Sequence, residues 1–184
     1  MGLIRGSFSL LGEKVMPSWK VHRLWAQRLG LNDALSQEVD KIIDLNEEFE
    51  GFRVGHDWIK GSIGKFETAV ELFYKKFGVE GVKAMMLHGV LDYMADLLKE
   101  GKDDEEILWR TVSWVKFAGA KHVINYVSKL PKDERLTWVL RQGWGYYNYF
   151  APNLKEAGLR SGEELVDFVI KNFDEMLASV KYES

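Results

Sequence analysis

The four histidines of the chain stand at nearly even intervals, and one of them is followed directly by an aspartate. They are His22, His56, His88 and His122, with Asp57 next to His56. The intervals match the length of a helix or a helical hairpin with its turn, so each histidine falls on a different segment. A helical bundle assembles a polar site in its interior from residues on separate segments in this way. Imidazole and carboxylate groups are common metal ligands and proton-transfer groups.

His88 lies in a stretch from Ala84 to Leu91 that is apolar nearly all round, which predicts a buried imidazole. Asp92 follows one helical turn later on the same face. Because an unpaired buried carboxylate is costly, we expect this histidine and aspartate to pair with each other or to bind a common metal. His122 follows the small residues 118–120, which allow another helix or a ligand to come close, and it is also expected to point inward. A core imidazole bonded to a carbonyl is the structural alternative for each histidine.

The order His22, His56-Asp57, His88, His122 resembles the HD superfamily of helical metal-dependent phosphohydrolases, which is named after its adjacent His-Asp pair. The resemblance spans residues 19–122. It implies a helical fold with a divalent metal, namely Mn, Fe, Zn, Ni or Mg, and hydrolysis of a phosphate ester. The implied reaction uses metal-bound water with a lowered pKa and a polarised phosphoryl oxygen.

The same resemblance implies roles for individual residues. One metal would be bound by His22, His56, Asp57 and Asp92, while His88 and His122 would bind a second metal or the substrate phosphate. Lys60 and Asp57 are the implied catalytic residues. Residues 56–60 are similar to the family's His-Asp-Ile-Gly-Lys form, and the ammonium group of Lys60 would neutralise charge on the phosphoryl group. A solvated lysine is the alternative for Lys60.

A later aspartate completes the metal site in the dinuclear branch of this family, and Asp167 is in the right order for that role. Its helix face also carries four other charged residues, namely Glu163, Glu164, Lys171 and Asp174. A face of that composition predicts that Asp167 points into water.

A second resemblance competes with the first. Trp19 and the His-x-x-x-Asp turn formed by His88 and Asp92 are similar to features of zinc-dependent phospholipase C and related single-strand nucleases, which are also helical.

The composition predicts one soluble globular domain over residues 1–184, with 1–15 as an N-terminal extension that lacks any period. The chain is 46% hydrophobic, 13% aromatic and 29% charged, which is a globular balance. Its net charge of −3 makes nucleic acid an unexpected partner. Because there is no cysteine, His, Asp and Glu must supply any metal ligands, and a cytoplasmic location is compatible. No membrane span and no cleaved signal are expected, since no apolar run of about 18 residues occurs.

Periodicity and capping signals predict about seven helices, at 19–29, 36–45, 65–77, 79–100, 103–129, 133–140 and 161–180. Gly119 is a candidate for a bend in the fifth of them. Gly30, Gly78 and Gly101 mark three of the helix ends. Ser161 and Glu164 have the spacing of a capping box at the start of the last helix. The fold class is therefore all-α, as a single-domain bundle or an orthogonal array.

Two functions are compatible with these features. The first is a metal-dependent phosphohydrolase or phosphodiesterase of HD-like type that acts on a small phosphate ester such as a nucleotide. The second is a non-catalytic helical protein with structural histidines, which forms a homo-oligomer or binds a partner through its Trp- and Tyr-rich segment 138–150. Rings in that segment are expected in the core, in a subunit interface or on a stacking surface.

Overall fold

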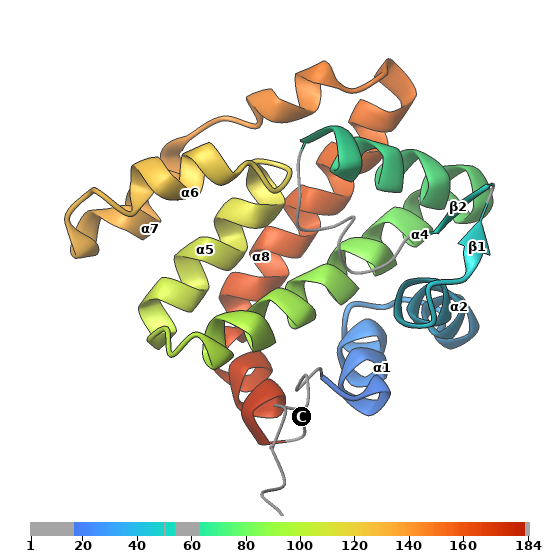
Figure 1. Cartoon of the computed structure of the whole chain (residues 1–184), viewed down its shortest axis with the longest axis horizontal. Coiled ribbons are helices and arrows are strands. Elements are labelled where there is room, and N and C mark those ends of the chain that lie inside the picture. Colours follow the sequence, from blue (N-terminus) through green and yellow to red (C-terminus); the bar gives the residue numbers. More distant parts are fainter. Residues whose placement is uncertain (1–16, 50, 54–62, 183–184) are drawn as a thin grey trace, which may run out of the picture.

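The computed structural model of the chain describes residues 17–49, 51–53 and 63–182, which form an all-α fold (Figure 1). Its seven α-helices are α1 (Trp19–Arg28), α2 (Asp33–Asp44), α4 (Ile63–Lys99), α5 (Asp104–Lys116), α6 (Lys121–Val127), α7 (Arg135–Arg141) and α8 (Pro152–Tyr182). Two 3₁₀ helices accompany them, η1 (Lys132–Glu134) and η2 (Gly145–Tyr149). The predicted fold class is confirmed.

One antiparallel pairing joins β1 (Glu48–Phe49) and β2 (Phe52–Arg53), in the register Glu48 to Arg53 and Phe49 to Phe52. Strands of two residues are too short to show an alternating pattern, so the sequence carried no signal for them.

Side-chain caps begin the two helices at the N-terminal end of the described chain. The hydroxyl of Ser18 accepts a hydrogen bond from the backbone N–H of Val21 at the start of α1. Asn32 accepts one from the backbone N–H of Leu35 at the start of α2. These bonds satisfy backbone donors that the first turn of a helix leaves without partners.

Helix α4 is bent where two separate helices were predicted to meet. Gly78 has φ 71° and ψ −159° inside α4, so the helical path breaks there and resumes at once. This conformation is accessible almost only to glycine. The second half of α4, which runs on to Lys99, carries the apolar stretch around His88.

The single helix predicted over 103–129 is wrong, because α5 ends at Lys116 and α6 begins at Lys121. Ala118 and Gly119 between them have φ values of 49° and 73°, which no right-handed helix contains. The candidate bend at Gly119 is therefore a full break between two helices.

The predicted start of the last helix at Ser161 is also wrong. Helix α8 begins at Pro152, a residue favoured in a first helical turn, and Ser161 is fully buried in the helix interior. Leu154 and Ala157 extend its buried face toward the N-terminus. The spacing of Ser161 and Glu164 therefore occurs here without capping a helix.

Helices α4 and α8 form the centre of the fold and pack along each other (Figure 1). Helix α5 packs against both of them, while α1 and α2 contact α4 from another side. Lys83 on α4 is largely buried and forms ion pairs with Glu80, at 3.1 Å, and with Glu164 on α8, at 2.6 Å. The contacts of α1 and α2 with α4 position the residues of the candidate site.

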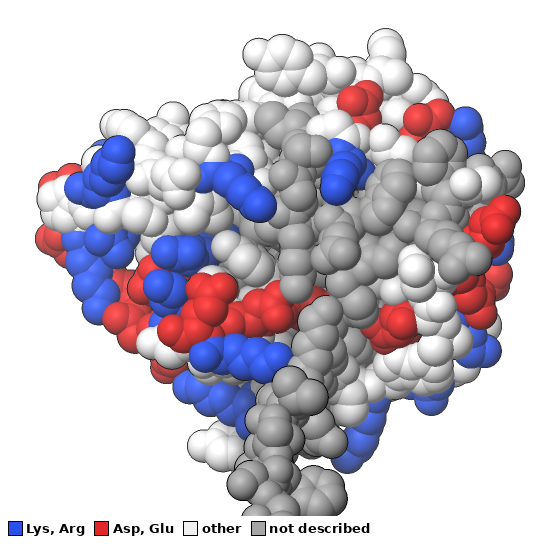
Figure 2. All heavy atoms as spheres, in the orientation of Figure 1, with Lys and Arg blue, Asp and Glu red and all other residues white. Residues whose placement is uncertain are grey.

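On the face drawn in Figure 2, Lys and Arg side chains are interspersed with Asp and Glu side chains. None of the described helices is both long and apolar enough to cross a membrane.

Candidate metal centre

Five titratable side chains meet where α1 and α2 pack against the second half of α4. His22 comes from α1, Asp40 and Asp44 from α2, and His88 and Asp92 from α4. Asp44 is half-buried and the other four are buried, with His88 exposing only 1% of its surface. Such groups are rarely buried together unless they bind one another or a cation.

His88 lies at the centre of this group of five side chains, which we call the His-Asp cluster. Its Nδ1 lies 2.7 Å from Oδ1 of Asp40, within hydrogen-bond distance. Its Nε2 lies 3.2 Å from Oδ1 of Asp44 and 3.1 Å from Oδ2 of Asp92. Both ring nitrogens of His88 therefore face carboxylates.

His22 lies face to face with His88. The two rings are nearly parallel, with centroids 4.2 Å apart and an interplanar angle of 7°. Nε2 of His22 lies 3.2 Å from Oδ1 of Asp92, so Asp92 approaches both imidazoles, one with each carboxylate oxygen. Neither ring nitrogen of His22 makes a hydrogen bond within the described part of the chain, although both are buried.

The charge of the cluster favours a bound cation. Three carboxylates meet only two imidazoles here, so acidic groups outnumber basic ones among these five side chains. Burial disfavours the imidazolium form of His88, but the adjacent carboxylate of Asp92, the hydrogen bond between Nδ1 and Asp40, and the carboxylate of Asp44 close to Nε2 outweigh it. The pKa of His88 is therefore raised well above its ordinary value.

The separations also match a metal coordination sphere. Ligand atoms of His22, His88 and Asp92 all lie within 4.8 Å of one another. Two atoms that each bind one ion at about 2.1 Å, at tetrahedral or octahedral angles, lie roughly 3.0 to 3.4 Å apart. The distances of 3.1 and 3.2 Å from the imidazoles to Asp92 fall in this range, but they involve two different carboxylate oxygens, Oδ2 for His88 and Oδ1 for His22. Because the two rings are stacked and nearly parallel, they would have to tilt for both lone pairs to reach one ion.

Asp40 gives His88 the hydrogen-bond partner that a metal-binding histidine usually has on its other ring nitrogen. If the Nδ1–H of His88 donates to Asp40, the tautomer with its lone pair on Nε2 is favoured. That nitrogen faces Asp92 and Asp44. A residual cavity of about 10 Å³ adjoins His22, Asp40 and His88, enough for little more than one water molecule or ion.

The structure brings together three of the residues singled out in the sequence, His22, His88 and Asp92. These three residues form one group. The assignment of His88 to a second metal or to the substrate phosphate, apart from His22 and Asp92, therefore does not match this geometry. His56, Asp57 and Lys60 lie outside the described residues.

His122 does not join the cluster. It lies exposed on α6, where its Nε2 is 2.5 Å from the hydroxyl of Tyr146. The expectation that it points inward is wrong, because the break at Ala118 and Gly119 turns α6 away from the line of α5. Asp167 is exposed on α8, as its charged helix face predicted.

Sequence reasoning missed Asp40 and Asp44. They are one helical turn apart, and Asp40 lies among the buried residues Ser36, Val39 and Ile43 of α2. An aspartate on the apolar face of an amphipathic helix was the available signal, because a buried carboxylate needs a partner elsewhere in the fold.

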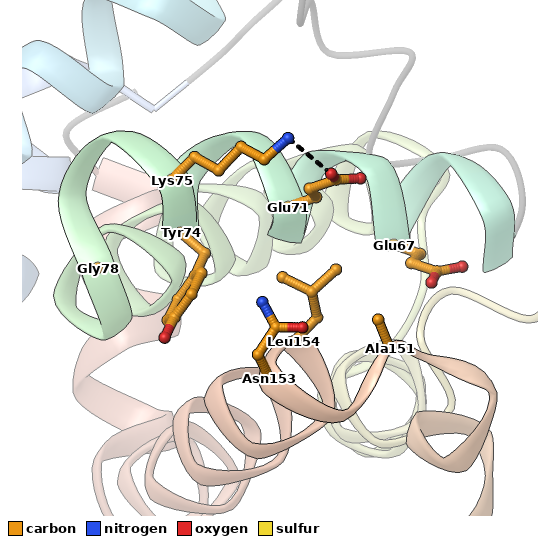
Figure 3. A pocket seen from close by; sticks show the side chains of 8 residues that line it. All are labelled: Glu67, Glu71, Tyr74, Lys75, Gly78, Ala151, Asn153 and Leu154. Carbon is orange, nitrogen blue, oxygen red and sulfur yellow. Dashed lines mark ion pairs between the residues drawn. The ribbon is translucent and has the colours of Figure 1, made fainter.

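Larger clefts lie away from the cluster. One of about 530 Å³ runs between α4 and the start of α8, and Figure 3 shows Glu71 paired with Lys75 at its edge, opposite Asn153 and Leu154. Another, of about 870 Å³, lies beside α6 and α7 and is lined by His122 and Tyr146. Neither is lined by a residue of the His-Asp cluster.

No family model matches the chain, and neither a curated protein nor a solved structure matches it. What the His-Asp cluster does is therefore inferred from its own geometry and chemistry.

Proposed function

We propose that the protein is a metal-dependent phosphohydrolase of HD-like type, in which His22, His88 and Asp92 bind a divalent cation. The observation that carries the proposal is the convergence of these three side chains, with Nε2 of each imidazole 3.1 to 3.2 Å from Asp92. Mixed imidazole and carboxylate ligands suit Mn, Fe, Zn or Ni.

Each member of the cluster has a distinct task in this proposal. His22 supplies a buried imidazole whose nitrogens make no hydrogen bond in the described chain, so one of them is available to a metal. Asp40 orients His88 through Nδ1 and leaves Nε2 for the ion, while Asp44 is placed to bind the ion or a water on it. Binding of a cation at Nε2 would require that this nitrogen of His88 carry no proton.

A bound divalent cation supplies Lewis acidity and a water of lowered pKa, which are the requirements for hydrolysing a phosphate ester such as a nucleotide. His56 and Asp57 remain predicted further ligands, and Lys60 remains a predicted partner of the phosphoryl group. These three residues fall outside the described ranges.

One observation favours a non-catalytic alternative. The cavity that His22, Asp40 and His88 line has a volume of about 10 Å³, which is too small for a phosphate ester. In this second candidate function the ion, or the imidazole–carboxylate pairs alone, would stabilise the contact between α1, α2 and α4.

The first experiment is to measure the metal content of the protein purified without chelator, by plasma mass spectrometry. We expect at least one Mn, Fe, Zn or Ni per chain in the wild type. His22→Gln, His88→Gln and Asp92→Asn should lose it while circular dichroism shows an unchanged helix content. His122→Gln is the matched control and should retain the metal, since His122 is not in the cluster.

The second step tests catalysis with p-nitrophenyl phosphate and bis-p-nitrophenyl phosphate in the presence of Mn²⁺. Hydrolysis that is lost in Asp92→Asn and retained in His122→Gln supports the phosphohydrolase. A metal-loaded protein that hydrolyses neither ester, nor a set of nucleotides, would favour the structural role. A protein that contains no metal and takes none up contradicts the metal centre itself.

A further inference from the structure

The cleft of about 870 Å³ beside α6 and α7 has features of a binding site that is separate from the His-Asp cluster. Its walls come from the end of α5, from α6 and α7, and from η2. A volume of this size lies within the range of about 300 to 1,000 Å³ that small-molecule sites occupy.

Aromatic rings dominate the walls of this cleft. Phe117 is buried, and its ring centroid lies 6.2 Å from that of Trp138 and 5.5 Å from that of Tyr146, in an edge-to-face contact with the latter. These contacts hold the three rings in place before any ligand arrives. Tyr149 also lines the cleft but is 79% exposed, so its ring is available for stacking.

Apart from His122, the polar side chains of the cleft carry hydroxyl or amide groups. His122 and the hydroxyl of Tyr146 lie within hydrogen-bond distance of each other, at 2.5 Å. Gln142 donates its amide N–H to the carbonyl of Trp138, which fixes the side chain and leaves its amide oxygen able to accept. Asn148 adds a second amide to the lining. Apart from His122, no residue that lines the cleft has an ionisable side chain other than its tyrosines.

The backbone that turns the chain into this cleft is strained. Ala118, next to Phe117, has a φ of 49° although it is not glycine, and it is fully buried. A left-handed conformation is unfavourable for alanine, and residues held in one are found preferentially at functional sites. The left-handed turn at Ala118 and Gly119 directs α6 back toward the end of α5, so that His122 lies at the cleft.

We propose that this cleft binds a neutral, planar heteroaromatic ring of the nucleobase type. The flat rings of Trp138, Tyr146 and Tyr149 suit the faces of such a compound, and the amides of Gln142 and Asn148 suit the hydrogen-bonding groups on its edge. A phosphate group would find no lysine or arginine in the lining. The cleft between α4 and α8 fits this ligand less well, because a glutamate–lysine pair and one tyrosine replace the cluster of rings (Figure 3).

The test is calorimetric titration of the full chain with adenosine and cytidine, with ribose as the non-aromatic comparison. We expect at least one of the two nucleosides to bind and ribose not to bind. Tyr149→Ala should weaken that binding about tenfold, given the usual contribution of one stacking ring. Tyr182→Ala is the matched control and should bind like wild type, because it removes an equally exposed tyrosine, 85% exposed, at the end of α8.

Asp92→Asn separates this site from the proposed metal centre and should leave nucleoside affinity unchanged. Three results would overturn the proposal. One is the absence of binding by both nucleosides. Another is binding that is unaffected by Tyr149→Ala. The third is a concentration-dependent dimer, seen by sedimentation, that Tyr149→Ala dissociates and nucleosides leave intact, which would make the cleft an interface between copies of the chain.

Discussion

At the scale of single residues, the orientation of Asp44 is a feature of the His-Asp cluster that can be tested without changing a proposed ligand. The indole N–H of Trp19 donates to Oδ2 of Asp44 at 2.5 Å, and Oδ1 of the same carboxylate faces His88. Trp19 is thus a positioning residue that fixes which oxygen of Asp44 points toward the proposed ion.

Trp19→Phe should therefore reduce metal affinity by about 10- to 100-fold, the usual effect of losing an outer-shell hydrogen bond. Affinity is measured by competition with a chelator of known strength. Trp25→Phe is the matched control. It also removes an indole N–H from α1, but that N–H donates to Ser179 and not to the cluster. It should lower stability but leave metal affinity unchanged. Equal losses of affinity in the two variants would mean that Asp44 has no specific role.

At the scale of elements, the bend of α4 depends on one glycine. Gly78 combines φ 71° with ψ −159°, a conformation in which a side chain is strained even though the space around it is open. The bend lies between the N-terminal half of α4, which lines the cleft of Figure 3, and the C-terminal half, which carries His88.

Gly78→Ala should lower the free energy of unfolding by about 1 to 3 kcal/mol. Urea denaturation followed by circular dichroism measures it. Gly64→Ala is the control in the same helix, because Gly64 is exposed, has open space around it and no positive φ. It should be neutral or stabilising by up to about 1 kcal/mol. A stable Gly78→Ala variant would contradict the bend.

At the scale of the whole molecule, an ion pair joins the two longest helices. Glu164 on α8 lies 2.6 Å from the ammonium group of Lys83 on α4. The hydrogen bond from Lys83 outweighs burial and lowers the pKa of Glu164. Burial lowers the pKa of Lys83, but hydrogen bonds to Glu164 and Glu80 reverse this and raise it above 10.5.

The sign of the pH dependence follows from these directions. Because the folded-state pKa of Glu164 is depressed, its contribution to stability is present above its ordinary pKa of about 4.5 and is lost as the pH falls through the folded value. Lys83 contributes over the neutral range and loses its contribution only in strongly alkaline solution.

Glu164→Gln should therefore lower the free energy of unfolding at pH 7 by less than about 1 kcal/mol, since Glu164 is partly exposed and screened by water. As the pH falls below 4.5 and through the depressed folded-state pKa of Glu164, the variant and the wild type should converge. Urea unfolding at pH 7 and at pH 3.5 measures both quantities. Glu163→Gln removes the neighbouring exposed charge and should match wild type at both pH values. A difference that persists unchanged at low pH would rule out the ion pair as its cause.

Several features of this protein followed from its sequence alone. The all-α class, the helix ends near Gly30 and Gly101 and the break in the helical path at Gly78 were predictable, because periodicity and positive φ are local properties of the chain. The burial of His88 and Asp92 was also predictable, since the stretch around them is apolar on every side. Local signals failed at Ser161, where packing against neighbouring helices holds a serine inside α8.

Only the tertiary structure decided which side chains share a site. The order of the histidines grouped His122 with His88, but a strained turn at Ala118 directs α6 elsewhere, and no pattern predicts a left-handed alanine. Asp40 and Asp44 entered the cluster because α2 packs its apolar face on α4, which brings carboxylates from one helix to an imidazole of another. Sequence spacing determines which residues share a helix face, whereas contacts between helices depend on how those faces pack together.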